Sequence, residues 1–239
     1  MRLDVLLARN AGWSRTAARG VIADGRVRIA GEVVEDPRRD LPVGALPFAV
    51  AVDDGELLLY DRVSLMLNKP TGCVTALRDP QHPTAYALLR GAPLFGELRP
   101  VGRLDLDTAG LLLWSSDGAE IQRLTHPKRA VPRTYQAALA RPFGPRPARL
   151  VLDDGHEPTI TSLGELARAA AHPSLQIPDG TATLATITIV GGAYHEVRRI
   201  FAALGSHVLG LCRVRFGDVE LPGDLPPGQY RLRPNEARS

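Results

Sequence analysis

The sequence has few of the residues that build metal and disulfide sites. Of its 239 residues, two are cysteines, Cys73 and Cys212, and six are histidines scattered along the chain. No group of these residues has the spacing of a metal site, and two cysteines allow one bridge at most. The sequence therefore predicts no zinc site, no disulfide framework and reduced thiols.

Long apolar runs are also missing. No segment approaches the roughly 18 apolar residues of a membrane span. The first 15 residues, MRLDVLLARNAGWSR, contain an apolar run too short and too charged for a signal peptide. With 44% hydrophobic residues the chain is typical of a globular protein, and we expect it to be cytoplasmic, with no membrane partner.

Lysine is nearly absent, so that the basic groups are almost all arginine. Lys69 and Lys128 are the two lysines, and the formal net charge is +3. Six arginines fall within the first 28 residues, against the acidic Asp4 and Asp24. Arginines on an exposed helix are usually just solvated, but this concentration favours a phosphate-binding face. The arginines are Arg2, Arg9, Arg15, Arg19, Arg26 and Arg28.

Helical spacing dominates the first 25 residues. Leu3, Leu6 and Leu7 predict a first helix, and Ser14 is placed to cap a second one that Gly25 ends. RVRIAGEVV then alternates like a strand with a glycine turn. Residues 36–60 mix Pro and Gly with a short strand-like run, which we interpret as the end of one module and a linker.

Strand-like segments dominate the rest of the chain. One clear helix is predicted at about 195–204, with Val197, Ile200, Phe201 and Leu204 as its buried stripe and Gly205 as its end. LGELARAAA, at 163–171, suggests a short helix in an insertion. Strands without regular βαβ alternation predict an α+β fold with a mixed or antiparallel sheet.

In the segment GRLDLDTAGLLLWSSDG, residues 102–118, charged residues come directly before an apolar run that is typical of a buried strand. In a strand, Arg103, Asp105 and Asp107 would share one face, just before the apolar run Leu111–Trp114. A hairpin with charged residues in solvent is the commoner explanation, and a cleft is the alternative. The cleft is favoured by the segments that accompany this one in order: LNKPTG, RTYQAAL and GGAYHEVRRIFAALGSHV.

This ordered set resembles the bacterial pseudouridine synthases of the small-subunit ribosomal RNA type, with an S4-like RNA-binding domain in front. The resemblance covers nearly the whole chain. It implies an S4-like domain and linker over residues 1–60, followed by a catalytic domain over residues 61–235. The catalytic domain is expected to hold a mixed, mostly antiparallel central sheet with flanking helices.

Pseudouridine formation breaks the N1–C1′ bond of a uridine, turns the base and rejoins it through C5. The reaction needs one carboxylate at the ribose and no cofactor. The resemblance assigns that carboxylate to Asp105, its guanidinium partner to Arg198, and a tyrosine that packs on the base to Tyr135. A covalent ribosyl adduct, attack on the base and proton abstraction from C2′ all remain open. Members of the family commonly have Gln where this chain has Glu196, which adds a negative charge near the proposed pair.

Further residues are expected to contact or shape the RNA site. Asn68 and Lys69 are expected to shape a loop under the segment that carries Asp105, with contact to phosphate as the alternative for Lys69. Arg103 is expected to help flip the base. The full set expected to bind substrate is Arg103, Asn68, Lys69, Arg199, Arg2, Arg15 and Arg19.

The resemblance implies a monomeric isomerase that converts a specific uridine of 16S ribosomal RNA to pseudouridine, within a small-subunit assembly particle. Two alternatives stay open. One is a pseudouridine synthase of 23S ribosomal RNA, and the other is a non-catalytic RNA-binding assembly factor that has kept the fold.

Overall fold

The computed structural model describes residues 1–42, 44 and 46–234. Contacts between Cα atoms divide them into two compact units. The first contains Met1–Val63 together with Gly91–Leu98, and the second contains Ser64–Arg90 and Arg99–Arg233. The end of the expected catalytic domain, residue 235, lies outside the described residues. No helix of the described residues is long and apolar enough to cross a membrane.

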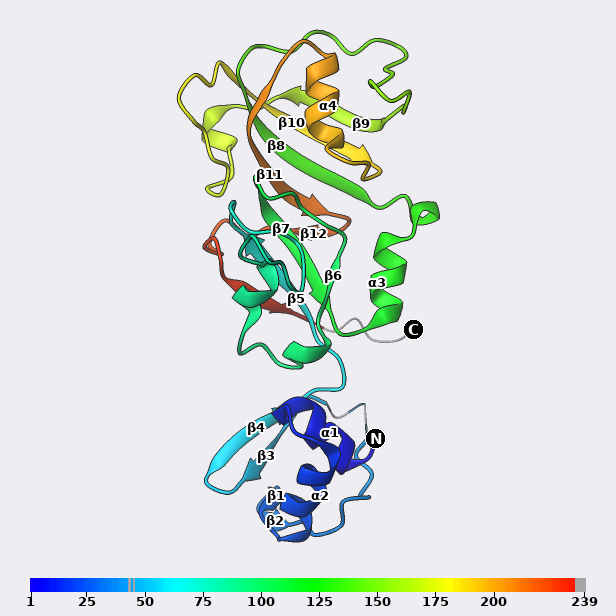
Figure 1. The fold of residues 1–239 in the computed structure, drawn as a ribbon, viewed down its shortest axis with the longest axis vertical. Helices are drawn as coiled ribbons and strands as arrows, with labels where there is room; N and C mark the ends of the chain where they lie inside the picture. The colour runs from blue at the N-terminus through cyan, green and yellow to red at the C-terminus, as the bar shows by residue number, and fades with distance from the viewer. Residues whose placement is uncertain (43, 45, 235–239) are drawn as a thin grey trace. The chain divides into compact units, whose positions relative to one another are not determined.

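Two short helices pack on a small sheet in the first unit (Figure 1). α1 spans Leu3–Ala11 and α2 spans Arg15–Ala23. The Ser14 hydroxyl accepts a hydrogen bond from the amide of Ala17, as expected of a capping serine. Leu3, Leu6, Leu7 and Ile22 are fully buried, which confirms the apolar face predicted for these helices.

Residues 36–60 end the first unit, as predicted, but most of the segment expected to be a linker is a pair of strands. β3, Phe48–Val52, and β4, Gly55–Leu59, form an antiparallel hairpin whose first strand pairs with β1. Alternating apolar residues and the turn before Gly55 outweigh the proline content of the preceding segment. The sheet order is β2-β1-β3-β4, with β1 at Val27–Ile29 and β2 at Glu32–Val33.

A nine-stranded sheet forms the second unit. Its order is β13-β5-β7-β11-β8-β10-β9, with β12 paired to β11 and β6 to β7. β7 and β11 are parallel and the other pairs are antiparallel, which confirms the mixed, mostly antiparallel sheet. The strands are β5 Ser64–Lys69, β6 Arg99–Val101, β7 Thr108–Ser115, β8 Pro132–Leu139, β9 Thr159–Glu165, β10 Thr183–Val190, β11 Val208–Phe216, β12 Val219–Glu220 and β13 Tyr230–Arg233.

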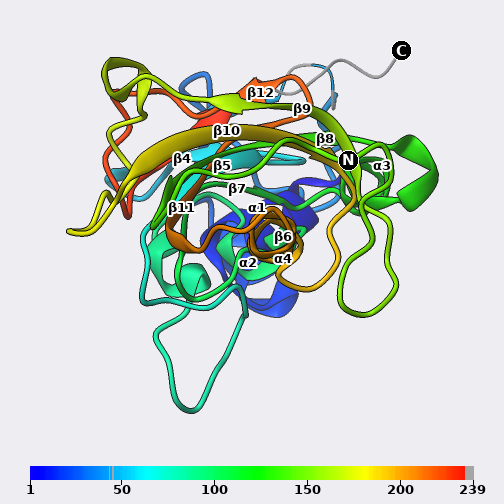
Figure 2. The ribbon, with the colours of Figure 1, turned by 90° about the horizontal axis from the view of Figure 1, so that it is seen from above.

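Helix α4, Glu196–Ala203, lies on the inner side of this curved sheet (Figure 2). Its buried stripe is the predicted one, since Val197, Ile200, Phe201 and Leu204 are all nearly inaccessible. A second helix, α3 at Gly118–Thr125, was not predicted, because its apolar face is limited to Ile121 and Leu124, which are only partly buried. Asp117 caps it by accepting a hydrogen bond from the amide of Ala119.

The predicted helix at 163–171 is wrong. Residues up to Glu165 belong to β9, which pairs with β10, and only Arg168–Ala170 form a single 3-10 turn, η5. Further 3-10 turns are η2 Ala85–Leu89, η3 Phe95–Glu97 and η4 Pro127–Arg129. β9 is therefore an edge strand of the sheet. α4 contacts the segment before β7 through Arg198 and Asp107.

Candidate active site

The segment that carries Asp105 is a loop rather than a strand. Residues 102–107 connect β6 to β7, and Gly102 has a φ of 77°, which a residue with a side chain rarely adopts. β7 follows at Thr108 and is buried along its whole length. The charged residues therefore belong to a loop held by a core strand, so that the one-face arrangement of a strand does not apply to them.

Hydrogen bonds from elsewhere in the unit hold the loop at residues 103–107 and the first residue of β7. The carbonyls of residues 103–108 each accept one from outside the loop. Lys69 Nζ donates to the carbonyls of Asp105 and Thr108, both at 2.9 Å. Thr75 Oγ1 donates to the carbonyl of Leu104 and the amide of Gly72 to that of Leu106, both at 2.8 Å. Two longer bonds of 3.4 Å run from Arg213 Nη1 to the carbonyl of Arg103 and from Arg198 Nη2 to that of Asp107. These hydrogen bonds satisfy the carbonyls of the segment and restrict its movement.

The Asp105 side chain is 34% exposed, so its carboxylate is accessible from outside. Within the described residues, the basic group nearest to it is His195, whose Nε2 lies 3.7 Å from Asp105 Oδ2. His195 precedes α4 with a φ of 50°, and its ring stacks on Tyr194 with centroids 3.9 Å apart. The carboxylate is thus held next to an imidazole and an aromatic ring.

The ion pair expected between Arg198 and Asp105 is replaced by another. Arg198 Nη2 lies 2.8 Å from Asp107 Oδ2, and its Nη1 donates to the carbonyl of Val208 at 3.1 Å. Asp105 and Asp107 are two residues apart in a tight loop, so either could have met a guanidinium from α4. Arg198 lines the cavity that Asp105 also lines, but its carboxylate partner is Asp107, two residues after Asp105.

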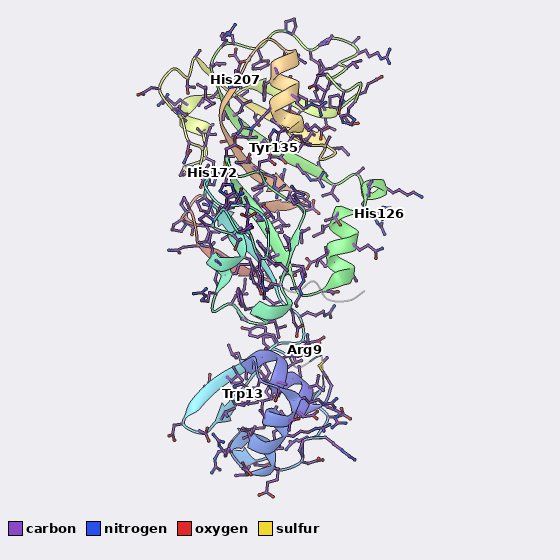
Figure 3. The ribbon with its side chains drawn as sticks, in the orientation of Figure 1. Arg9, Trp13, His126, Tyr135, His172 and His207 are labelled. Carbon is purple, nitrogen blue, oxygen red and sulfur yellow. The ribbon has the colours of Figure 1, made fainter. Side chains whose placement is uncertain are left out.

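A cavity of about 370 Å³ lies above the sheet at this point, within the range of small-molecule sites. Tyr135, on β8 near the start of α4, lines it and is 8% exposed (Figure 3). The cavity therefore combines the carboxylate, the tyrosine and several basic groups. Its other lining residues include Arg103, Thr108, Arg133, Tyr194, His195, Glu196, Arg198 and Arg213.

Three residues expected to bind substrate have other partners. Asn68 is fully buried and donates to Ser174 and to the carbonyl of Leu225, both at 2.7 Å. Lys69 is also fully buried, and its ammonium group contacts backbone carbonyls. Arg199 pairs with Asp153 and Asp154. None of the three lines the cavity, so Asn68 and Lys69 shape the structure and Arg199 anchors a loop.

The N-terminal arginines gather around one buried carboxylate. Asp4 is fully buried, and its oxygens accept hydrogen bonds from Arg2, Arg15 and Arg19 at 2.8–3.1 Å. Burial opposes its ionisation, but these bonds outweigh burial and lower the pKa of Asp4 to about 2. Arg15 and Arg19 remain about half exposed. One carboxylate thus orients three guanidiniums and leaves the cluster with net positive charge.

Glu196 has partners in the loop before α4 and in the segment that carries His156. Its carboxylate, 2% exposed, lies 2.9 Å from His156 Nε2 and accepts a hydrogen bond from the amide of Ala193 at 2.9 Å. The extra negative charge is therefore taken up by the loop before α4 and by the segment that carries His156.

Several lining residues were not anticipated: Arg133, Tyr194, His195 and Arg213. Arg133 stands two residues before Tyr135, so on one strand the two share a face. Arg213 interrupts the apolar run VLGLC, and an arginine inside a core strand is a signal of a functional or bonded group.

Comparisons with known proteins agree with this geometry. The RNA pseudouridylate synthase family matches residues 63–203, and the S4 domain matches residues 1–46. Ribosomal small subunit pseudouridine synthase A of Escherichia coli (strain K12) is 36% identical over 97% of this chain and 95% of its own. The protein of the same name from Haemophilus influenzae is also 36% identical, over 97% and 95% of the two chains. A crystal structure of a pseudouridylate synthase, 34% identical, aligns with a TM-score of 0.56 over 98% of this chain and 96% of the other. The chain, with its carboxylate, tyrosine and arginines around one cavity, belongs to the RNA pseudouridylate synthase family and is an isomerase.

Proposed function

We propose that this enzyme converts a specific uridine of 16S ribosomal RNA to pseudouridine, with Asp105 as the catalytic carboxylate. The observation that carries the proposal is the placement of an accessible Asp105 carboxylate on a fully bonded loop, at a cavity lined by arginines and Tyr135. The relatives named for the small subunit, matched over 97% of the chain, support the choice of RNA.

A uridine inside folded RNA cannot enter such a cavity without leaving its stack. The nucleotide is flipped out, at a cost of a few kcal/mol. The flipped base packs against Tyr135, where stacking contributes about 1–3 kcal/mol. Arg103, exposed at the rim, is placed to meet the RNA that the base has left.

Asp105 then acts on the ribose. Cleavage of N1–C1′ leaves an electron-deficient sugar, and an ionised carboxylate at this point serves either as a nucleophile at C1′ or as a base at C2′. After the base turns, C5 bonds to C1′ and loses its proton. In the first case the bond between Asp105 and C1′ breaks as C5 attacks, and in the second C2′ regains its proton. Asp105 needs no cofactor for these steps, because nothing is oxidised and no group is added.

The S4 unit supplies the RNA grip in this proposal. Arg15 and Arg19 each give one Nε to Asp4 and stay half exposed, so they present positive charge in a fixed orientation. Ionic contacts with phosphate dominate the affinity of such surfaces. We place the substrate within an assembling small subunit, with the enzyme as a monomer.

The test uses release of tritium from 5-tritiated uridine, since C5 loses its hydrogen only when the glycosidic bond moves there. Wild-type enzyme and Asp105→Asn are assayed on 16S and 23S transcripts and on small-subunit assembly intermediates. We expect release from 16S RNA by the wild type and none by the variant, which should retain the fold and RNA affinity because the change is nearly isosteric. Release by Asp105→Asn would rule out Asp105, and release only from 23S RNA would rule out the small-subunit substrate.

A further inference from the structure

The cavity contains one guanidinium that is buried but not fully hydrogen-bonded. Arg213, on β11, is 1% exposed and lines the cavity. Its Nε donates to the carbonyl of Leu111 at 2.8 Å, and its Nη1 to that of Arg103 at 3.4 Å. Its Nη2 is buried and has no hydrogen-bond partner among the residues that the structure describes. A buried donor that belongs to a charged group is costly to leave unpaired.

A second guanidinium lines the same cavity. Arg133, on β8, lines the same cavity, and in the sheet it pairs with Phe216 of β11. The guanidinium carbons of Arg133 and Arg213 lie 4.9 and 5.1 Å from the centre of the Phe216 ring. Burial, together with the positive charge of Arg213, lowers the pKa of Arg133. The fold therefore brings two cations to the same cavity and the same phenylalanine ring, and one of them is fully buried.

No carboxylate neutralises this pair within the described structure. Glu196 is the acidic neighbour whose charge Arg133 senses, but its oxygens are occupied by His156 and the amide of Ala193. Asp107 is paired with Arg198. Two guanidiniums without a counter-ion, at a site that already holds the catalytic loop, are arranged for an anion that arrives from outside.

We propose that Arg133 and Arg213 form a phosphate subsite, which binds a backbone phosphate next to the flipped uridine while its ribose faces Asp105. The proposal rests on the function proposed above. A phosphodiester fits better than a uracil carbonyl, because a neutral oxygen would satisfy one donor but leave both positive charges uncompensated. Arg213 also bonds the carbonyl of Arg103 in the catalytic loop, so a phosphate bound there is positioned relative to Asp105.

The salt dependence of RNA affinity distinguishes these ligands. Each phosphate contact that is lost reduces the slope of log affinity against log salt by about 0.7–0.9. Affinity is measured for the full chain in an Asp105→Asn background, so that the RNA is not converted, with a 16S transcript at several salt concentrations. The variants are Arg133→Gln, Arg133→Lys and Arg213→Gln. Arg215→Gln is the control, since Arg215 lies on the same strand but pairs with Glu220 and does not line the cavity.

We expect Arg133→Gln to weaken binding roughly tenfold and to reduce the slope by about one phosphate contact, whereas Arg133→Lys and Arg215→Gln keep the slope. Arg213→Gln should reduce the slope in the same way. If that variant does not fold, as its melting curve will show, the two Arg133 variants decide. An unchanged slope for Arg133→Gln would overturn the phosphate subsite, and weaker binding at unchanged slope would indicate contact with a neutral atom.

A failure of the proposed substrate would appear separately. Enzymes that carry Asp105 and each arginine variant are assayed for tritium release from 16S and 23S transcripts. If only 23S RNA is converted, the small-subunit proposal fails, and the slopes measured on the 23S transcript then test the subsite.

Discussion

Arg198 and Asp107 form an ion pair of 2.8 Å that joins helix α4 to the loop of residues 102–107. The same guanidinium donates to the carbonyl of Asp107 at 3.4 Å. Asp105 lies two residues earlier on the loop, so the pair helps to fix the segment that carries the Asp105 carboxylate without touching that carboxylate. Under the function proposed above, Arg198 is a positioning residue.

This relationship predicts matched losses for the two partners. Arg198→Ala and Asp107→Asn should each lower kcat by about 10- to 100-fold with little change in KM, because a small misplacement of a catalytic group is costly. The double variant should be no worse than the poorer single one, since both remove the same contact. Steady-state kinetics measure this, with Arg199→Ala as the neighbouring control. A much larger loss for Arg198→Ala alone would mean that Arg198 also acts on Asp105 directly.

Lys69 provides a second test of loop positioning. Its buried ammonium bonds the carbonyls of Pro70, Asp105 and Thr108, and burial lowers its pKa. Lys69→Met leaves those carbonyls unpaired, so we expect unfolding to become easier by about 2–4 kcal/mol and turnover to drop more than tenfold while the protein is still folded.

Lys128 is the matched control for this variant, since it is the other lysine and is exposed. Lys128→Met should change neither the urea unfolding midpoint nor turnover. Amine-reactive labelling of the native protein should modify Lys128 and leave Lys69 intact. Rapid labelling of Lys69 would contradict its burial.

Asp4 predicts a loss of stability in acid. Its pKa is about 2 in the fold and near 3.8 in the unfolded chain. A carboxyl whose folded pKa is lowered stabilises the fold above its unfolded pKa, and this contribution is lost as the pH falls from about 4 to 2. We expect Asp4→Asn to lower stability by about 1–2 kcal/mol at pH 7, after allowance for screening of the half-exposed arginines.

Urea unfolding of wild type and Asp4→Asn at several pH values measures the difference, which should disappear near pH 2. Asp54→Asn, in the same unit but exposed, should behave like wild type throughout. A constant difference between Asp4→Asn and wild type down to pH 2 would show that the arginines do not stabilise the Asp4 carboxylate.

Two variants of Glu196 test whether its partners require a hydrogen-bond acceptor or a negative charge. Glu196→Ala leaves the Ala193 amide and His156 without their buried partner, so we expect a loss of about 2–3 kcal/mol in stability and reduced turnover. Glu196→Gln keeps an oxygen for the amide and should restore most of both. If Gln behaves like Ala in melting and turnover assays, the negative charge itself is required.

The sequence alone predicted those parts of the fold that local signals encode. Ser14 caps α2, the apolar stripe of α4 is the observed one, and the run Leu111–Trp114 is a buried strand. α3 escaped prediction because it buries no residue. The β3–β4 hairpin escaped because its alternation follows a proline-rich stretch.

The site was less accessible to prediction, since its contacts join distant segments. Asp105 and Asp107 are two residues apart on the same loop, so the sequence could not decide which of the two carboxylates pairs with Arg198. Lys69 and Asn68 belong to one motif, yet β5 buries both. Arg213 follows an apolar run, which is a signal in the sequence, but its place at the cavity depends on the sheet that sets it between Gly110 of β7 and Tyr135 of β8.

The six bonded carbonyls of residues 103–108 have a consequence for how this enzyme loses activity on heating. Their donors belong to β5, to the segment after it, to α4 and to β11. The loop cannot melt by itself without breaking bonds to each of these segments, and it cannot form until all of them are in place. Thermal inactivation should therefore coincide with unfolding of the second unit instead of preceding it. The conformational entropy of the loop is lost when the chain folds, so that RNA meets a loop already ordered.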